Sequence, residues 1–187
     1  ASLKSLCDRY GLPLHMDGAR LWNASAFSGL PIKELLKDVD TVSVCYSKGL
    51  GAPVGSVLAG SSSFIARARR LRKVTGGGMR QAGVLAAAAL YALEHNFPKM
   101  HEDHRRLEEI RSALSVLPDL EVPAAVDTNI LFFEANNGPE LAKALKERHG
   151  VLVGSYGPHR LRITTHPNIK DEDVTKVVSA ITEEMKR

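Results

Sequence analysis

The stretch Leu12–Ser56, LPLHMDGARLWNASAFSGLPIKELLKDVDTVSVCYSKGLGAPVGS, decides the fold class of this chain. It contains two short apolar runs, residues 12–16 and residues 41–46, which have the length and composition of β-strands. The first run ends at Asp17 and the second is followed by Lys48, and each of these two residues precedes a glycine. We therefore expect two strands that end in loops, with an acid after the first strand and a lysine after the second.

The residues between the two runs predict a helix. Between residues 32 and 36, apolar side chains recur at helical spacing after a break at Gly29–Pro31. A strand, helix, strand order favours a parallel sheet, and ligands of parallel sheets bind outside the carboxyl ends of the strands. Asp17 and Lys48 are therefore expected in one crevice.

An acid and a lysine in one crevice permit two interpretations. They could form an ordinary ion pair with a purely structural role. Alternatively they could form a cofactor site, because a lysine that binds a carbonyl cofactor must be reachable, and an aspartate keeps the nitrogen of a pyridine cofactor protonated. The glycines at positions 49, 51 and 55 let the backbone after Lys48 turn sharply and approach a ligand, which favours the cofactor site.

Four motifs extend this interpretation to nearly the whole chain. They are HMDGAR at His15–Arg20, YSKGLGAPVGS at Tyr46–Ser56, GGGMRQAGVLAAA at Gly76–Ala88 and RLRITTH at Arg160–His166. With these motifs in this order, the chain resembles the low-specificity L-threonine aldolases, which are pyridoxal 5'-phosphate (PLP) enzymes of the aspartate-aminotransferase-like fold (fold type I). The resemblance implies aldol cleavage of β-hydroxy-α-amino acids, L-threonine and L-allo-threonine, to glycine and an aldehyde.

The resemblance also implies roles for the residues around the first two motifs. Lys48 would bind PLP covalently, and Asp17 would stabilise the protonated pyridine nitrogen. Arg20 would lie near the cofactor and the substrate, with an ion pair to Asp17 as an equal alternative. No general base is assigned, because the family's candidate histidine precedes the part of the sequence present here, and His15 is interpreted as a structural residue.

Further cations are assigned from the last two motifs. Lys73 and Arg80 flank the glycines at positions 76–78 and would contact the cofactor phosphate across a subunit interface. Arg160 and Arg162 alternate with apolar residues, so both emerge from one face of a predicted strand. By the resemblance, Arg162 would hold the substrate carboxylate, which a planar guanidinium matches well, whereas Arg160 is interpreted as a surface charge.

We expect an α/β protein of two parts. Residues 1–97 would be a remnant of the large PLP-binding domain, with a mostly parallel sheet and an interdomain helix. Residues 98–187 would form a small α+β C-terminal domain. After Pro118 the pattern predicts short strands at residues 120–122, 129–134, 151–153 and 160–164, and the chain closes with an amphipathic helix from Asp171 to Lys186. In the family a phosphate-binding loop precedes the first motif, so we expect this chain to be the C-terminal part of the enzyme.

Composition argues against other classes of function. The chain has 187 residues, 44% of them hydrophobic, and a formal net charge of +4, as is typical of a globular protein. The basic segment 67–73 lacks the aromatic residues on which bases stack, so no nucleic acid is expected as a partner. The longest apolar stretch, residues 82–93, is too short to span a membrane. His95, His101 and His104 lack a further ligand at metal-binding spacing, so no metal is expected.

The expected partners are a small amino-acid substrate and other copies of the chain, in a homo-oligomer that is a dimer or a tetramer. Two cysteines do not form a disulfide framework and fit a reducing compartment. We expect a cytoplasmic location, with a mitochondrial one as the alternative, and a role in glycine biosynthesis and threonine catabolism. Two other functions stay open: another fold-type-I PLP enzyme that acts on amino acids, and a truncated, non-catalytic fragment that lacks the phosphate-binding loop.

Overall fold

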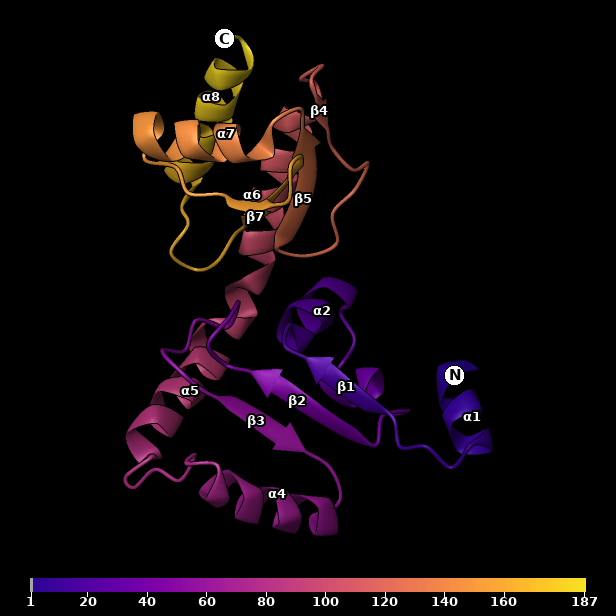
Figure 1. The fold of residues 1–187 in the computed structure, drawn as a ribbon. Coiled ribbons are helices and arrows are strands. Elements are labelled where there is room, and N and C mark those ends of the chain that lie inside the picture. Colours follow the sequence, from indigo (N-terminus) through magenta and orange to yellow (C-terminus); the bar gives the residue numbers. More distant parts are fainter. Residues whose placement is uncertain (1) are drawn as a thin grey trace. The chain divides into compact units, whose positions relative to one another are not determined.

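The computed structural model describes residues 2–187, and the chain divides into two compact units, Ala1–Pro98 and Lys99–Arg187. Each unit has its own sheet and its own helices (Figure 1). The mixture of helices and strands confirms the predicted α/β class.

The sheet of the first unit has the strand order β1-β2-β3, with β1 at His15–Gly18, β2 at Thr41–Cys45 and β3 at Ser56–Ala59. β1 and β2 run parallel, and β3 pairs antiparallel with β2 (Figure 1). Two short helices, α2 (Leu21–Ser28) and α3 (Ile32–Leu35), connect the parallel strands. The strand, helix, strand order predicted from the sequence is therefore present.

One face of this sheet is buried. Val42 and Val44 alternate with half-buried residues along β2 and pack with Leu21 of α2. Partly buried apolar residues of β1, α2, α3 and the turn after α3 surround these three; they are Met16, Trp22, Ile32, Leu35, Leu36 and Val39. β3 is exposed along its whole length. The apolar cluster on this sheet is therefore small.

The first unit contains three more helices: α1 (Ser2–Arg9), α4 (Ser62–Val74) and α5 (Gly83–His95). Ser61 caps the start of α4, because its Oγ accepts the backbone N–H of Phe64 at 3.3 Å. None of the residues of α4 is buried, so this helix depends on its own capping and composition more than on packing.

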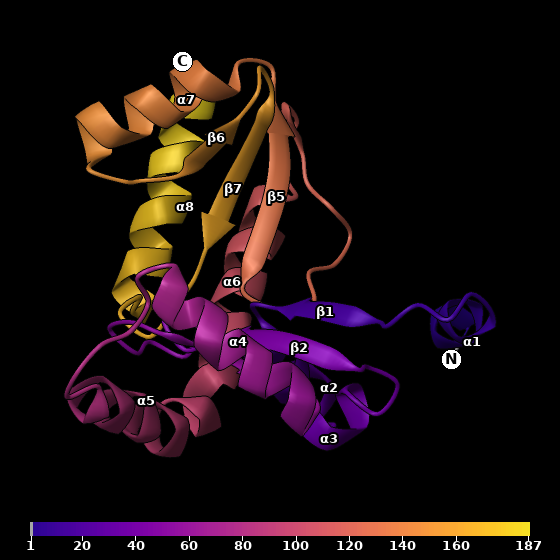
Figure 2. The ribbon, with the colours of Figure 1, turned by 60° about the horizontal axis from the view of Figure 1, so that its bottom comes forward.

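The sheet of the second unit is antiparallel throughout and has the order β4-β5-β7-β6. Its strands are β4 (Leu120–Glu121), β5 (Ile130–Ala135), β6 (Gly154–Tyr156) and β7 (Arg160–Thr164). β7 has the predicted bounds. Figure 2 shows β5, β7 and β6 side by side.

The strand predicted at residues 151–153 is displaced, and β6 begins at Gly154 instead. Val151 is buried, but its N–H is donated to the carbonyl of Leu145 in the preceding turn at 3.0 Å. Val151 and Val153 therefore pack against the core, with Leu152 exposed between them, before the chain starts to pair with β7.

Four helical segments complete the second unit: α6 (Met100–Leu114), α7 (Gly138–Ala144), the π-helical turn η2 (Leu145–His149) and α8 (Asp171–Met185). A short 3-10 turn, η1 (Phe97–Lys99), leads into α6. These helices and the inward residues of the sheet share one core. Its buried members are Leu107, Ile110, Leu114, Leu120, Leu131, Phe133, Ala135, Leu141, Leu145, Val151, Leu161, Ile163, Val174, Ala180 and Ile181.

Candidate functional site

Parallel pairing of β1 and β2 brings Asp17 and Lys48 to the same edge of the first sheet, the one formed by the carboxyl ends of these two strands. Asp17 is opposite Ser43 in register, and Lys48 follows the last residue of β2, Cys45, within the loop formed by residues 46–55, called here the Lys48 loop. Both side chains are exposed. Among the described residues no ion pair joins them, so the ordinary ion pair considered as an alternative does not form.

The Lys48 loop has a fixed backbone although the lysine side chain is exposed. Leu50 is 1% exposed, and its carbonyl accepts the Nδ2 hydrogen of Asn96 at 2.9 Å. Gly49 is buried against Asn23, and a Cβ at position 49 would lie 2.5 Å from the Asn23 Oδ1. A side chain at position 49 therefore does not fit, and the neighbours of Lys48 hold the loop in place.

The two ends of the Lys48 loop are also joined. The backbone N–H of Tyr46 is donated to the carbonyl of Gly55 at 3.0 Å. The Tyr46 ring stacks on Trp22 with ring centroids 6.0 Å apart, and the Trp22 indole N–H is donated to the carbonyl of Cys45 at 3.0 Å. A rigid turn that presents an exposed amine is the arrangement that a covalently binding lysine requires.

Local hydrogen bonds also orient the residues around Asp17. The Oδ1 of Asp17 accepts the N–H of Ala19 at 3.1 Å, which holds the carboxylate at the end of the strand. Arg20 is half-buried and immediately precedes α2. His15 Nδ1 lies 2.8 Å from the Oγ1 of Thr41 on the neighbouring strand, a contact that accords with its interpretation as a structural residue.

Lys73 and Arg80 lie on either side of a glycine turn in the first unit. Lys73 is in the last turn of α4, Arg80 precedes α5, and both are exposed. Gly76 has a φ of +84°, and a Cβ at Gly78 would lie 3.3 Å from the Cγ of Lys73, so the turn folds back against the end of α4. Their role toward a phosphate stays a prediction.

Arg162 lies in β7 of the second unit, opposite Phe132 of β5 and Gly154 of β6. The Cζ of its guanidinium is 4.9 Å from the ring centroid of Tyr156. Within the described part of the chain, this guanidinium makes no ion pair, so its donors are available to a carboxylate. Arg160, two residues earlier, is exposed and lies over the Phe132 ring at 4.5 Å.

The sequence did not indicate three residues that support these side chains. Asn23 and Asn96 contact the Lys48 loop but are distant from it in the sequence, so no local sequence pattern indicates them. The ring of Tyr156 on β6 contacts Arg162 on the neighbouring strand β7. The only sequence signal for that contact is the alternation of Gly154 and Tyr156 near the strand that carries Arg162, and it does not specify a register.

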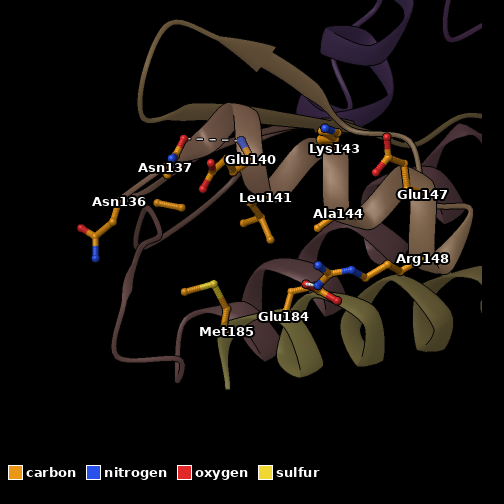
Figure 3. Close-up of a pocket in the computed structure, with 11 residues that line it drawn as sticks. Asn136, Asn137, Glu140, Leu141, Lys143, Ala144, Glu147, Arg148, Glu184 and Met185 are labelled. Carbon is orange, nitrogen blue, oxygen red and sulfur yellow. Dashed lines mark hydrogen bonds and ion pairs between the residues drawn. The ribbon is translucent and has the colours of Figure 1, made fainter. Parts of the chain in front are cut away.

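A pocket of about 500 Å³ in the second unit contains none of the predicted site residues (Figure 3). It lies beside Glu184, whose side chain is 5% exposed. Arg148 donates its Nη1 hydrogen to the Glu184 Oε2 at 2.6 Å, and His149 Nε2 lies 2.8 Å from the Oε1. The contact with His149 and the charge of Arg148 lower the pKa of the Glu184 carboxyl. This carboxylate is therefore a structural link between α8 and η2.

Within residues 2–187, no helix combines the length and the apolar composition needed to cross a membrane. In the same range, no group of three or more His, Cys, Asp and Glu side chains is arranged to hold a metal ion.

The family model of the beta-eliminating lyases matches residues 1–137. The chain belongs to this family. Low-specificity L-threonine aldolase 1 of Arabidopsis thaliana is 45% identical over 185 residues, which cover 96% of this chain and 52% of that protein. The low specificity L-threonine aldolase of Escherichia coli (strain K12) is 40% identical over 173 residues, which cover 90% of this chain and 50% of that protein. The chain thus spans about half the length of these curated relatives.

A solved structure of threonine aldolase from Leishmania major has a TM-score of 0.81 to this chain, with 17% identity, over 98% of this chain and 55% of that one. This match supports the fold. Together with the curated relatives it confirms the predicted resemblance to the low-specificity L-threonine aldolases.

Proposed function

We propose that this protein is a PLP-dependent lyase that cleaves L-threonine and L-allo-threonine to glycine and an aldehyde. The observation that carries this assignment is the setting of Lys48. Its amine is exposed on a loop that Leu50 and Asn96 fix, at the sheet edge that also carries Asp17. The names of the curated relatives support the choice of substrate.

The residues of this edge fit PLP. Lys48 offers an amine that is not engaged in an ion pair within the described residues. Asp17 uses its Oδ1 for the N–H of Ala19, so its second oxygen can accept a hydrogen bond from a protonated ring nitrogen. When it is bound, PLP supplies an electron sink for the carbanion that forms at Cα.

The chain's own residues then have separate tasks. Lys48 would hold the cofactor, and Asp17 would keep its pyridine nitrogen protonated. Arg162 binds the substrate carboxylate, and Arg20 lies near substrate and cofactor. Removal of the β-hydroxyl proton by a base, which we leave unassigned, allows the Cα–Cβ bond to break; the aldehyde then leaves, and protonation at Cα gives glycine.

Two further cations, Lys73 and Arg80, are proposed to act between copies of the chain in an oligomer. Lys73 and Arg80 would bind the phosphate dianion of a cofactor held by another copy of the chain, since two exposed cations beside a glycine turn suit such a group. A homo-oligomer, dimer or tetramer, follows from this role. A cytoplasmic location and a place in glycine biosynthesis and threonine catabolism belong to the same proposal.

The test begins with the near-visible absorption of the chain after addition of PLP. We expect an absorption band that depends on Lys48, and borohydride reduction followed by peptide mass mapping should find the reduced cofactor on Lys48. Lys48→Ala should lose the band and any release of acetaldehyde from L-threonine. Lys33→Ala is the matched control, because Lys33 is also an exposed lysine of the first unit.

Two results would contradict the assignment. Reduced cofactor on a different lysine would remove Lys48 from the site. A Lys48-dependent band without cleavage of L-threonine would exclude this substrate for the chain as tested and favour another PLP reaction on amino acids or a non-catalytic fragment.

A further inference from the structure

The strand next to Arg162, β6, leaves room for an aromatic ring beside this arginine. Gly154 is directly opposite Arg162 on β6 and contributes no side chain, whereas Tyr156 is opposite Arg160. The Tyr156 ring occupies the space that Gly154 leaves empty, since a Cβ at Gly154 would lie 2.9 Å from the Tyr156 Cε2 and 3.6 Å from the Arg162 Cβ. The ring therefore leans diagonally toward Arg162.

A second aromatic ring limits the movement of the first. Phe132 is directly opposite Arg162 on β5 and meets the Tyr156 ring edge to face, with centroids 5.8 Å apart and an interplanar angle of 74°. Such a perpendicular pair is favourable beyond simple burial. Tyr156, 46% exposed, is thus supported on one side while its face lies against the Arg162 guanidinium.

The two arginines of β7 differ in the charge around them. Arg160 has Glu134 directly opposite on β5, and Glu121 of β4 is the next residue across the sheet. Arg162 instead has Phe132 directly opposite on β5 and Gly154 directly opposite on β6. A substrate carboxylate is therefore repelled by neighbouring acids at Arg160 but meets no opposing acid across the sheet at Arg162.

We propose that Tyr156 is a positioning residue, which holds the Arg162 guanidinium against its ring so that the in-plane N–H donors face the carboxylate of an amino acid. This inference rests on the proposed function, in which Arg162 binds that carboxylate. Stacking covers a face of the guanidinium and leaves its N–H edges free. It also restricts the side chain before the substrate arrives, which reduces the entropy lost on binding.

The experiment follows the Arg162 Nε–Hε signal by NMR in the full chain during titration with L-threonine, and in parallel with L-threoninamide, which lacks the carboxylate. An Arg162→Lys variant identifies the signal. We expect L-threonine to shift it and the amide to leave it unchanged. Tyr156→Leu should weaken the apparent affinity for L-threonine roughly fivefold, as expected for loss of a cation–π contact at a partly exposed site, and Tyr156→Phe should restore it to within about twofold.

A second variant tests the same contact while retaining the tyrosine. Gly154→Ala should displace the Tyr156 ring, because of the 2.9 Å approach, and weaken the affinity in the same direction. Tyr10→Leu, which replaces another exposed tyrosine, is the control for general effects. In the PLP-loaded protein, Tyr156→Leu should raise the KM for L-threonine by the same factor as it weakens binding and change kcat much less.

The outcomes separate this inference from the proposed function. If Tyr156→Leu binds L-threonine as the wild-type chain does, or if L-threonine does not shift the Arg162 signal at all, the positioning role is overturned whether or not the protein cleaves threonine. If binding at Arg162 depends on Tyr156 but no threonine is cleaved, the positioning role stands and the aldolase assignment fails.

Discussion

The two units differ in how their sheets are packed. The apolar cluster on the first sheet has three buried members, Leu21, Val42 and Val44, whereas the core of the second unit has fifteen, with Leu131 and Phe133 near 0% exposure. Yet five of the six proposed site residues belong to the first unit. The proposed cofactor site thus lies in the unit whose sheet buries fewer apolar residues, where local contacts such as those of the Lys48 loop provide the rigidity.

The largest expected effect is a loss of stability in the second unit. Phe133→Ala should lower the free energy of unfolding by about 3–5 kcal/mol, because it leaves a cavity in a closed core. Val44→Ala removes less apolar surface from a smaller cluster and should cost about 1–3 kcal/mol. Urea unfolding can separate the two units, because Trp22 is the single tryptophan and its fluorescence reports on the first unit, while far-ultraviolet circular dichroism reports on both.

The same experiment tests whether the two units unfold separately. If Phe133→Ala moves the Trp22 fluorescence transition as far as the circular dichroism transition, the units unfold together, and the difference in core size has no separate consequence. If the fluorescence transition stays in place, the first unit unfolds on its own.

Elements with a clear periodicity were predictable. Residues 160–164 alternate along β7, and Val174 and Ile181 of α8 recur at helical spacing, so both elements lie where the sequence predicts them. The strand predicted at residues 151–153 is wrong, because Val151 and Val153 face the core on either side of the exposed Leu152, an alternation that resembles a strand whether or not it pairs. Periodicity records burial, and strand pairing depends on backbone hydrogen bonds that the side-chain pattern does not specify.

The candidate site was predictable to a similar degree. Asp17 and Lys48 share an edge because parallel strands align their carboxyl ends, a rule that needs only the order of the elements. The contacts that make the site rigid follow no such rule. Asn96 reaches the carbonyl of Leu50, and the Tyr156 ring reaches Arg162, only after the tertiary fold has brought these residues together.

An effect of intermediate size is expected at Asp103 of the second unit, where a substitution should raise the free energy of unfolding instead of lowering it. This residue is 2% exposed, its Oδ2 has no hydrogen-bond partner, and its Oδ1 lies 3.8 Å from the Arg106 Nη1. Burial raises the pKa of the carboxyl to about 6. Because the folded pKa exceeds the unfolded one, near 3.9, ionisation costs stability as the pH rises from about 4 to 6. Asp103→Asn should therefore stabilise the chain by ~1–3 kcal/mol at pH 8 and have little effect at pH 4.

The measurement is urea unfolding of the wild-type chain and the variant at several pH values between 4 and 8. Asp119→Asn, at an exposed acid of the same unit, is the control and should not change the pH dependence. A variant less stable than the wild type at pH 8 would show that the contact with Arg106 outweighs the cost of burial. The second unit would then rely on a buried ion pair in addition to its apolar core.

The smallest effects on stability should come from the loss of a helix cap, and one such cap can be removed in each unit. Ser61→Ala removes the acceptor for the N–H of Phe64 at the start of α4, a helix with no buried residue. Asp173→Ala removes the carboxylate that accepts the N–H of Lys170 at 2.9 Å, at the start of α8. Each cap contributes about 1 kcal/mol to its own helix.

The two cap substitutions should differ in whether they destabilise only their own helix or the whole unit. α4 is not buried, so Ser61→Ala should accelerate amide hydrogen exchange in the first turn of that helix about fivefold and leave the urea midpoint unchanged. α8 places Val174 and Ile181 in the core, so Asp173→Ala should lower the free energy of unfolding of the second unit by about 1 kcal/mol. Equal changes in the urea midpoint would mean that α4 is coupled to the rest of its unit as tightly as α8 is. The first unit would then derive its cooperativity from contacts other than apolar burial.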